Sequence, residues 1–341
     1  MNSTERVQLT LMGQPVDRRA FAPVLSLYGA RLTDCPTDQY YTDPEAYAKG
    51  QTAILETFKP DFLLGPFSMP MIGAAYGSEL RYLDGDSPNI IRPVVRSMEE
   101  WDRLTPPDPD NHPILLYIRA AIRRLAAEHG GQVPLVMVLP TPADLPELIM
   151  GLDLWMETVL FNSLAAQRMM AKIIPFWVQL ANNCFQDGAN ILMLPCGFAS
   201  PRVVTREIVA TITRPALATA LAQLQGPVVL HNVGGPLLPY LDLLTGLPST
   251  IGYAMDQADN LGQARQVVGP ELVLLGGLDC INLARITSAQ VEEACLAVLD
   301  DRRHDGRFIL GTSGPDVPWS TPPENIHAMR KAAESFGWSP S

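Results

Sequence analysis

Polar side chains follow several short apolar runs in the second half of the chain. The clearest case is GPVVLHNVGG (226–235), where four apolar residues lead to His231 and Asn232 and two glycines follow. Imidazole, amide and carboxylate groups in such places can bind a metal, contact the polar edge of a ligand or move a proton. If the runs are strands of one parallel barrel, their polar ends meet at a single mouth. The other candidates in equivalent places are Thr141, Cys196, Asp256, Gln257, Asp279, Cys280, Thr312 and Ser313.

Each of these residues has a structural alternative. Asp, Asn, Ser and Thr commonly cap the next helix, although this explanation weakens when consecutive runs all end in polar residues. His231 could be a satisfied structural histidine. Cys196 and Cys280 fit small buried residues better than nucleophiles, because neither has a basic partner nearby in sequence. Asp256 and Asp279 are stronger candidates, since a carboxylate at the end of a buried strand needs a partner to offset its desolvation.

The elements that would position these residues are eight short apolar runs bounded by Gly, Pro, Asp or Asn. Such runs predict parallel strands buried on both faces, and amphipathic helical patterns lie between them. The alternation predicts a (β/α)8 TIM barrel. A doubly wound sheet is the alternative, but the chain has no GxGxxG after a strand and no GxxxxGK[ST]. The expected strands are residues 23–27, 61–67, 134–140, 189–195, 227–233, 250–255, 272–278 and 307–313.

The segment between the second and third expected strands is too long for one crossover. We therefore expect residues 68–133 to form a cap or insertion before the third barrel strand, within a single domain of residues 1–341. The expected helices cover residues 45–58, 112–130, 205–224, 259–269 and 288–301, with Pro215 starting or kinking the third. Thr287 or Ser288, and Thr321 before PPEN, are expected helix starts.

Composition limits the compartment and the partners. The 341 residues carry a formal net charge of −11 and are 47% hydrophobic, which disfavours nucleic acid or an anionic membrane as a partner. The five cysteines are scattered without a CxxC pair, so neither a disulfide framework nor a zinc ribbon is indicated. No apolar run reaches the roughly 18 residues of a membrane helix, and the N-terminus lacks a signal-peptide core. We expect a reduced, cytoplasmic protein.

Five segments resemble the uroporphyrinogen decarboxylase superfamily. They are DGANILML, VVLHNVGG, IGYAMDQADNLGQARQVVG, LLGGLDC and RFILGTSGPDVPWSTPPENIHAM, of which the last is the most specific. The resemblance covers residues 130–336 well and the first 130 weakly, and it too implies a (β/α)8 barrel. The decarboxylase branch carries an arginine-rich RQAGR segment after the first strand. This chain has SLYGARLTDCPTDQYY there, with Arg31 alone, so decarboxylation is the less favoured alternative.

The other branch comprises corrinoid-dependent methyltransferases. Many of them bind zinc through His-x-Cys after one strand and a cysteine before the TPxEN segment, and the zinc holds a thiol acceptor as a thiolate. The equivalent positions here are His231, Val233 and Ser313. Valine is no ligand and serine is a poor zinc ligand. The resemblance therefore points to the zinc-free methylcobalamin:tetrahydrofolate methyltransferases of glycine-betaine-type demethylation systems.

That resemblance implies a methyl transfer to N5 of tetrahydrofolate. Carboxylates and amides suit the donor-rich edge of a pterin, so Asn232, Asp256 and Asp279 are the expected contacts. His231, Asn232 or Ser313 would order a water near N5, and no nucleophilic side chain is required. The apolar walls would come from Met193 and Tyr253, with Phe67 or Phe198, and Cys196 completes the expected substrate-binding set.

The methyl donor, methylcobalamin, would be carried by a separate corrinoid protein, because the chain has no D-x-H-x-x-G segment and HDG at 304–306 has the wrong spacing. Two alternatives stay open. One is a zinc-dependent thiol methyltransferase that uses His231 with Cys196 or Asp279, and the other is a non-catalytic binding paralogue. The oligomeric state, a homodimer among the options, is also open.

Overall fold

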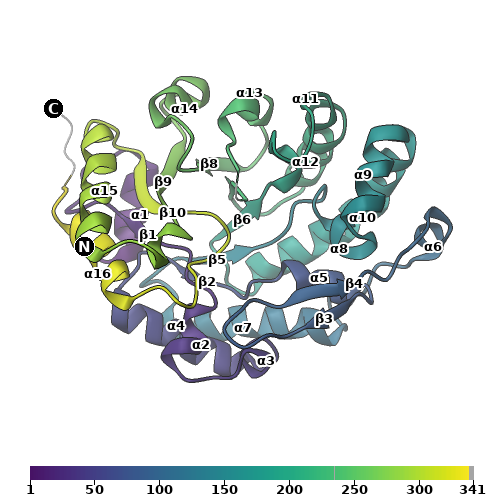
Figure 1. The fold of residues 1–341 in the computed structure, drawn as a ribbon, viewed down its shortest axis with the longest axis horizontal. Coiled ribbons are helices and arrows are strands. Elements are labelled where there is room, and N and C mark those ends of the chain that lie inside the picture. Colours follow the sequence, from purple (N-terminus) through teal and green to yellow (C-terminus); the bar gives the residue numbers. More distant parts are fainter. Residues whose placement is uncertain (234, 338–341) are drawn as a thin grey trace.

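An eight-stranded parallel sheet curls around the centre of the molecule, as the computed structural model of residues 1–233 and 235–337 shows (Figure 1). Helices cover its outer side, so the predicted (β/α)8-type fold is confirmed. Along the sheet the order is β1 (Phe21–Ala22), β10 (Phe308–Ser313), β9 (Val273–Asp279), β8 (Thr250–Ala254), β7 (Val228–His231), β6 (Ile191–Pro195), β5 (Leu135–Val138) and β2 (Leu63–Leu64).

Seven of these strands lie within the apolar runs expected from the sequence or extend one of them by a residue, and the first does not. Residues 23–27 were the expected first strand, but β1 is Phe21–Ala22 and pairs with Leu310 and Gly311. Pro23 has no N–H to donate to a ladder, which ends the strand. Residues 23–27 instead lead to the mouth, where the N–H groups of Ser26 and Leu27 donate to the Asp316 carboxylate.

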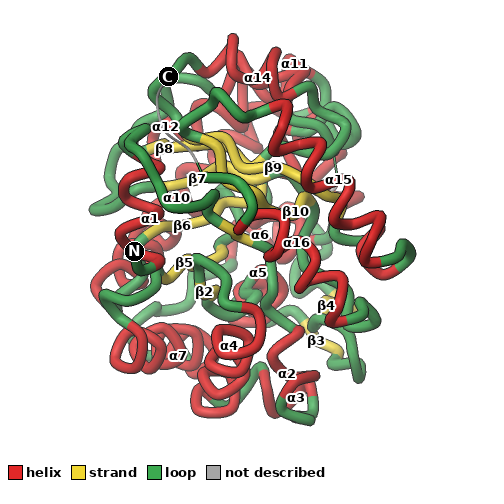
Figure 2. Tube along the Cα trace, turned by 90° about the vertical axis from the view of Figure 1, so that its left-hand side faces the viewer, coloured by secondary structure: helices red, strands yellow, loops and turns green. Residues whose placement is uncertain are grey.

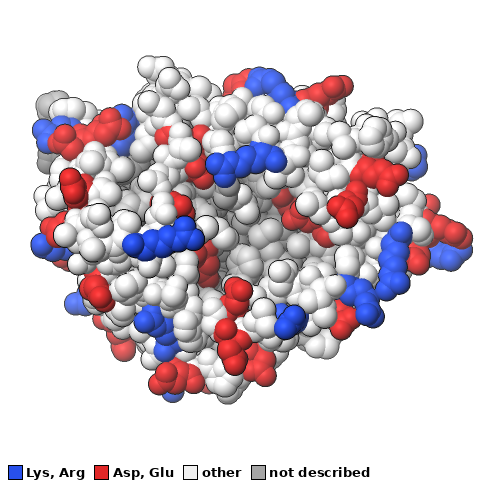
Figure 3. All heavy atoms as spheres, viewed as in Figure 1, with Lys and Arg blue, Asp and Glu red and all other residues white. Residues whose placement is uncertain are grey.

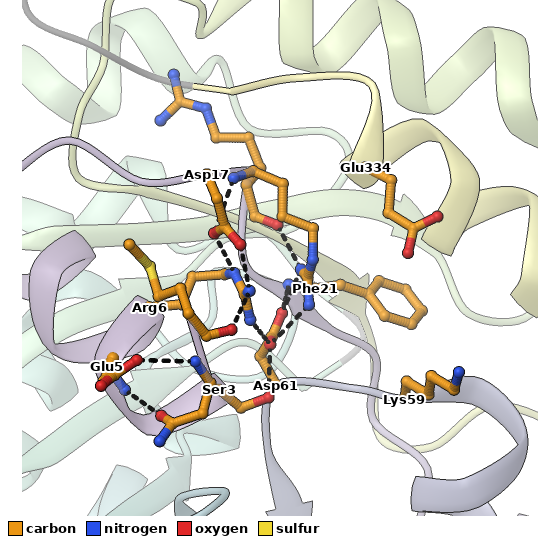
Figure 4. A network of polar contacts seen from close by, with 12 residues as sticks. Ser3, Glu5, Arg6, Asp17, Phe21, Lys59, Asp61 and Glu334 are labelled. Atoms are coloured by element: carbon orange, nitrogen blue, oxygen red, sulfur yellow. Dashed lines mark hydrogen bonds and ion pairs between the residues drawn. The ribbon is translucent and has the colours of Figure 1, made fainter.

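The edge strands β1 and β2 are joined through Asp61 rather than through a regular ladder. The Asp61 N–H donates to the Phe21 carbonyl at 2.7 Å, and the Asp61 carboxylate accepts the Phe21 N–H at 2.8 Å. Arg6, on α1 (Ser3–Leu11), and Arg18 both form ion pairs with the same carboxylate, at 2.8 and 2.7 Å (Figure 4). This buried cluster lies at the N-terminal ends of the strands, away from the mouth.

Side chains of the strands alternate between two apolar cores. Met193, Val229 and Ala254 belong to the core inside the sheet, whereas Leu230 and Tyr253 belong to the core between the sheet and its helices. The alternation follows from the two-residue period of a strand. It decides which strand residues can reach the mouth from inside the barrel.

The helices lie around the strands on the outside of the sheet (Figure 2). Among the described residues, no helix is long and apolar enough to cross a membrane. The helices are α2 (Tyr28–Leu32), α3 (Thr37–Tyr40), α4 (Pro44–Phe58), α5 (Met69–Ala75), α6 (Met98–Arg103), α7 (Pro113–His129), α8 (Leu145–Met150), α9 (Leu152–Phe161), α10 (Ser163–Gln186), α11 (Arg206–Ile208), α12 (Arg214–Leu221), α13 (Leu241–Leu244), α14 (Leu261–Val268), α15 (Ser288–Asp301) and α16 (Pro323–Glu334).

Three of the predicted helix starts can be compared with the structure. Thr287 caps α15 in a reciprocal capping box with Gln290, as expected. Thr321 does not cap α16, which begins at Pro323 with Pro322 in the cap position and no side-chain cap. The two prolines fix the backbone at the helix start instead. Pro215 lies in the first turn of α12, directly after the π-helical stretch Val209–Thr213, so it starts that helix as predicted.

The segment between β2 and β5 begins with α5 and ends with α7. Between them lie a two-stranded antiparallel hairpin, β3 (Glu79–Arg81) and β4 (Asn89–Arg92), and the short α6. Figures 1 and 2 both show the hairpin apart from the central sheet. α7 packs against α4 and β5, as a crossover helix would. That residues 68–133 act together as a cap or insertion stays a prediction.

Candidate active site

A cavity of about 280 Å³ opens at the C-terminal ends of the strands. Its walls are mostly apolar, and Figure 3 shows a hollow on this face with few charged atoms on its floor. The cavity is lined from the loop after β1, from β5, β6 and β7, and from the turn of the hairpin β3–β4. The lining includes Val24, Val138, Met193, His231, Val233 and the turn residues Asp86–Asn89.

His231 is the last residue of β7 and lies on the inner side of the sheet, two residues after Val229. Its side chain is nearly buried, with 2% of the residue exposed. Neither ring nitrogen has a hydrogen-bond partner among the described residues. Burial lowers the pKa of His231 to about 4. The imidazole is therefore neutral near pH 7, with one donor and one acceptor nitrogen that are both buried.

Asp256, Asp279 and Ser313 line a second pocket, which shares Pro315 with the cavity and also contains Arg202. The Asp256 carboxylate accepts hydrogen bonds from the Asn232 amide at 3.0 Å and from the Ala258 N–H. The Asp279 carboxylate accepts the Ile281 N–H at 3.0 Å. The structure thus brings the predicted polar residues to one mouth but separates the carboxylates from His231.

Asn232 lies buried next to this second pocket and contacts one of its lining residues, Asp256. The Asn232 side chain is fully buried, and its amide oxygen has no partner among the described residues. Because its amide nitrogen donates to Asp256, Asn232 fixes the orientation of that carboxylate.

Cys196 and Tyr253 do not reach the mouth, which corrects their expected place among the substrate contacts. Both are fully buried in the core between the sheet and the helices. The Cys196 thiol lies 3.1 Å from the Leu194 carbonyl, and burial raises its pKa well above the usual range. The Tyr253 hydroxyl donates to the Leu244 carbonyl at 2.8 Å. Of the two phenylalanines considered as walls, Phe67 lines the cavity, whereas Phe198 packs on Trp155 in the core.

The three positions implied as zinc ligands do not form a zinc site. His231 and Val233 line the cavity, whereas Ser313 lies in the second pocket. One imidazole with a valine and a serine is not a donor set for zinc. Across residues 1–233 and 235–337, no group of three or more His, Cys, Asp and Glu side chains could hold a metal ion. The residues present therefore do not fit zinc at this place.

Three further carboxylic acids near the mouth were not identified from the sequence. Asp144 is buried, accepts hydrogen bonds from the Thr141 hydroxyl and the Phe198 N–H, and has its pKa raised by burial to about 7. Burial also raises the pKa of Glu147 to about 8 and that of Asp316 to about 7. In the sequence Asp144 is indistinguishable from a helix cap, and no local pattern marks the other two.

The neutral state of His231 predicts how stability depends on pH. The pKa of His231 is lowered to about 4 in the folded chain, below the value of about 6.5 for an unfolded chain. Its contribution to stability is therefore present above about pH 6.5 and is lost as the pH falls toward about 4. Urea unfolding gives the free energy of unfolding at each pH. Between pH 8 and pH 5 it should fall by about 2 kcal/mol more for the wild type than for the His231→Gln variant. Equal losses would contradict a neutral, buried imidazole.

The comparison between wild type and His231→Gln also controls for the other groups that titrate over this pH range. Asp144, Glu147 and Asp316 have raised pKa values and act in the opposite direction over this pH range. They are present in both proteins, so their effects cancel in the difference.

A family model for "Uroporphyrinogen decarboxylase (URO-D)" matches residues 2–336 of the chain. A "Uroporphyrinogen decarboxylase" from Alkalilimnicola ehrlichii is 29% identical over 284 residues, which cover 77% of this chain and 73% of that protein. Another, from Trichlorobacter lovleyi, is 27% identical over 336 residues, 93% of this chain and 94% of that protein. A "Methylated-thiol--coenzyme M methyltransferase" from Methanosarcina mazei is 25% identical over 277 residues, 79% and 71% of the two chains.

Among solved structures, a "methyltransferase from Methanosarcina mazei" superposes with a TM-score of 0.87 and covers 98% of this chain and 99% of its own. At 17% identity that likeness concerns the fold. The family match extends over nearly the whole chain, including the first 130 residues where the sequence resemblance is weak. The chain belongs to the uroporphyrinogen decarboxylase (URO-D) family.

Proposed function

We propose that this protein transfers a methyl group from a methylated corrinoid to N5 of tetrahydrofolate, and that it does so without zinc. The observation that carries the proposal is the neutral, unpartnered imidazole of His231 in an apolar cavity, with Val233 beside it where a zinc site would need a ligand. The methyltransferase relative and the superposed methyltransferase structure support the general class of reaction.

The nature of the acceptor follows from what the cavity can activate. A thiol is a good nucleophile only as a thiolate, which zinc would stabilise. N5 of tetrahydrofolate is an amine of low basicity whose lone pair is available at neutral pH, so it requires no metal. A cationic histidine nearby would compete for that lone pair by protonating N5. It would also repel the positive charge that N5 gains as the methyl group bonds to it. The lowered pKa of His231 removes this conflict.

The size of the cavity limits which part of each substrate enters. Its volume of about 280 Å³ is just below the usual range of about 300–1,000 Å³ for ligand pockets. A bicyclic pterin head fits such a space, whereas the tail of the folate and the corrin macrocycle must stay outside. A methylated cobalt centre would therefore approach from the mouth, presented by a corrinoid protein that docks over it.

The chemical step needs positioning rather than a nucleophilic side chain. The N5 lone pair forms a bond to the methyl carbon while the cobalt–carbon bond breaks. Both electrons of that bond remain on cobalt, which gives cob(I)alamin, and the proton of N5 leaves to solvent. We assign His231 the role of holding the water that receives this proton. Asn232 and Asp256 would act at the neighbouring rim, where their hydrogen bond fixes the carboxylate.

Decarboxylation of a porphyrinogen is the competing function, because relatives of that name match the chain. Such a substrate carries several carboxylates, which arginine recognises best. None of the described residues lining the His231 cavity is Lys or Arg. Arg31, after the first strand, donates to the carbonyls of Trp319 and Thr321 and to the Tyr28 hydroxyl. Its hydrogen bonds are structural, which supports methyl transfer over decarboxylation in our proposal, although Arg202 lines the second pocket.

The proposal is tested by comparing acceptors with chelator-treated protein. Methylcobalamin is incubated with the protein after exhaustive treatment with EDTA, and cobalamin spectra are recorded with tetrahydrofolate, with a simple thiol, or with neither. We expect loss of methylcobalamin with tetrahydrofolate alone. Turnover with the thiol that disappears on chelation and returns with added zinc would instead support the zinc-dependent alternative. No turnover with either acceptor would support a non-catalytic paralogue.

A further inference from the structure

The turn of the hairpin β3–β4 forms one wall of the His231 cavity. Asp86, Ser87, Pro88 and Asn89 all line it, although they are far from the barrel strands in sequence. Nothing in their local sequence suggests a binding role, since DGDSP reads as an ordinary turn. Among the described residues that line the cavity, Asp86 is the one with an ionisable carboxyl group.

The turn is held in place against the barrel. The Gly85 N–H donates to the Thr37 hydroxyl at 3.3 Å, and Gly85 lies against the Trp319 ring, where an added Cβ would come within 3.3 Å of it. Gly85 also has a φ of +72°, which favours glycine. The close approach and the backbone conformation both constrain the turn that carries Asp86, which is exposed and lines both the cavity and the neighbouring groove.

The Asp86 carboxylate has an oxygen available for a ligand. One oxygen, Oδ1, accepts the Ser87 N–H at 2.8 Å, and no described residue donates to the other. By contrast, both oxygens of Asp256 already accept hydrogen bonds, from Asn232 and Ala258. Asp256 also lies in the second pocket and does not line the cavity that contains His231.

We propose that Asp86 is the residue that recognises the donor edge of a reduced pterin in this cavity. That edge consists of the exocyclic 2-amino group and the neighbouring ring N–H, two parallel donors that suit a carboxylate. The inference rests on the proposed function for the choice of ligand, and it replaces Asp256 and Asp279 as the expected contacts of that edge.

In this proposal the 2-amino edge of the pterin lies at Asp86 and its N5 lies toward His231. His231 comes from β7, the third strand from β2 along the sheet, and the hairpin follows β2. Asp86 and His231 therefore belong to separated sectors of the barrel wall. In a reduced pterin, N5 and the 2-amino edge are on different rings. A pterin with its amino edge at Asp86 would thus direct N5 toward His231.

The test is equilibrium binding of 6-methyltetrahydropterin, which has the pterin head without the folate tail. The variant is Asp86→Asn, with Asp84→Asn as the matched control. Asp84 belongs to the same turn but lines the neighbouring groove by Trp319 rather than the cavity. We expect Asp86→Asn to weaken binding about tenfold to a hundredfold and Asp84→Asn to change it less than about threefold.

A second ligand separates direct recognition from a disturbed hairpin. A tetrahydropterin with a methyl group in place of the 2-amino group should bind the wild type more weakly, and Asp86→Asn should weaken it no further. A structural effect of the substitution would weaken both ligands equally, and that result would overturn the inference. So would unchanged affinity of Asp86→Asn for 6-methyltetrahydropterin.

The proposed function and this inference can fail separately. If the wild type transfers methyl groups to tetrahydrofolate while Asp86→Asn binds the pterin normally, only the role of Asp86 is wrong. If Asp86→Asn loses pterin binding but the wild type transfers no methyl group, the pterin site stands and the proposed reaction is wrong. A wild type that does not bind the reduced pterin contradicts both.

Discussion

Asp61→Ala is expected to lower the free energy of unfolding by about 3–5 kcal/mol, because it removes one partner of a buried network of ion pairs. The carboxylate is fully buried and accepts from Arg6, Arg18, Ser3 and the Phe21 N–H. Its loss removes a negative charge that balances the buried positive charges of Arg6 and Arg18. It also takes away a hydrogen bond that joins β1 to β2. Urea unfolding followed by circular dichroism measures the change.

Asp17→Ala is the matched control for this network. Asp17 also binds Arg6, with an ion pair of 2.7 Å, but 45% of its side chain is exposed. Water can replace much of what this carboxylate provides, so we expect a loss of about 1 kcal/mol or less. If the two variants were equally stable, Asp61 would not be the group that closes the barrel between its edge strands.

Met193→Trp is expected to abolish binding of the methyl acceptor, with a dissociation constant for tetrahydrofolate at least about a hundred times that of the wild type. Met193 lies on β6, faces the inside of the sheet and lines the His231 cavity. An indole at this position would occupy the space proposed for the pterin head. Isothermal titration calorimetry with tetrahydrofolate measures the affinity.

The control keeps the volume of the side chain. Met193→Leu should bind within a few fold of the wild type, since volume-conserving changes in a core usually cost less than about 1.5 kcal/mol. Unfolding of both variants should be measured, because overpacking by tryptophan commonly costs about 1–3 kcal/mol of stability. A folded Met193→Trp variant with normal affinity would place the acceptor elsewhere, most directly in the pocket of Asp256 and Asp279.

Much of the fold could be predicted from the sequence, because buried parallel strands are continuous apolar runs. The first strand was displaced by two residues, since the apolar run continues past Pro23 although the ladder ends before it. Several helices are not predicted from the sequence, among them α8 to α10. α10 is 24 residues long and contains Pro175, which in a sequence suggests a break, yet the helix continues through it.

The candidate site could be predicted only where it depends on one strand. His231 was found because it ends an apolar run, and the two-residue period of a strand could have shown that Tyr253 faces the helices when Ala254 faces the barrel. The division between the His231 cavity and the pocket of Asp256 depends on how loops from different strands pack. Asp86 reaches the cavity from a hairpin remote in sequence, and no local pattern in one sequence indicates such a contact.

The most direct test of the account is a single turnover with ¹³C-methyl-labelled methylcobalamin, metal-free protein in excess, and tetrahydrofolate. The account predicts that the labelled carbon leaves cobalt and appears on N5 of tetrahydrofolate, together with an equal amount of cob(I)alamin, and that added zinc does not change the rate. Retention of the label on cobalt with folded, pterin-binding protein, or transfer that requires zinc, would contradict it.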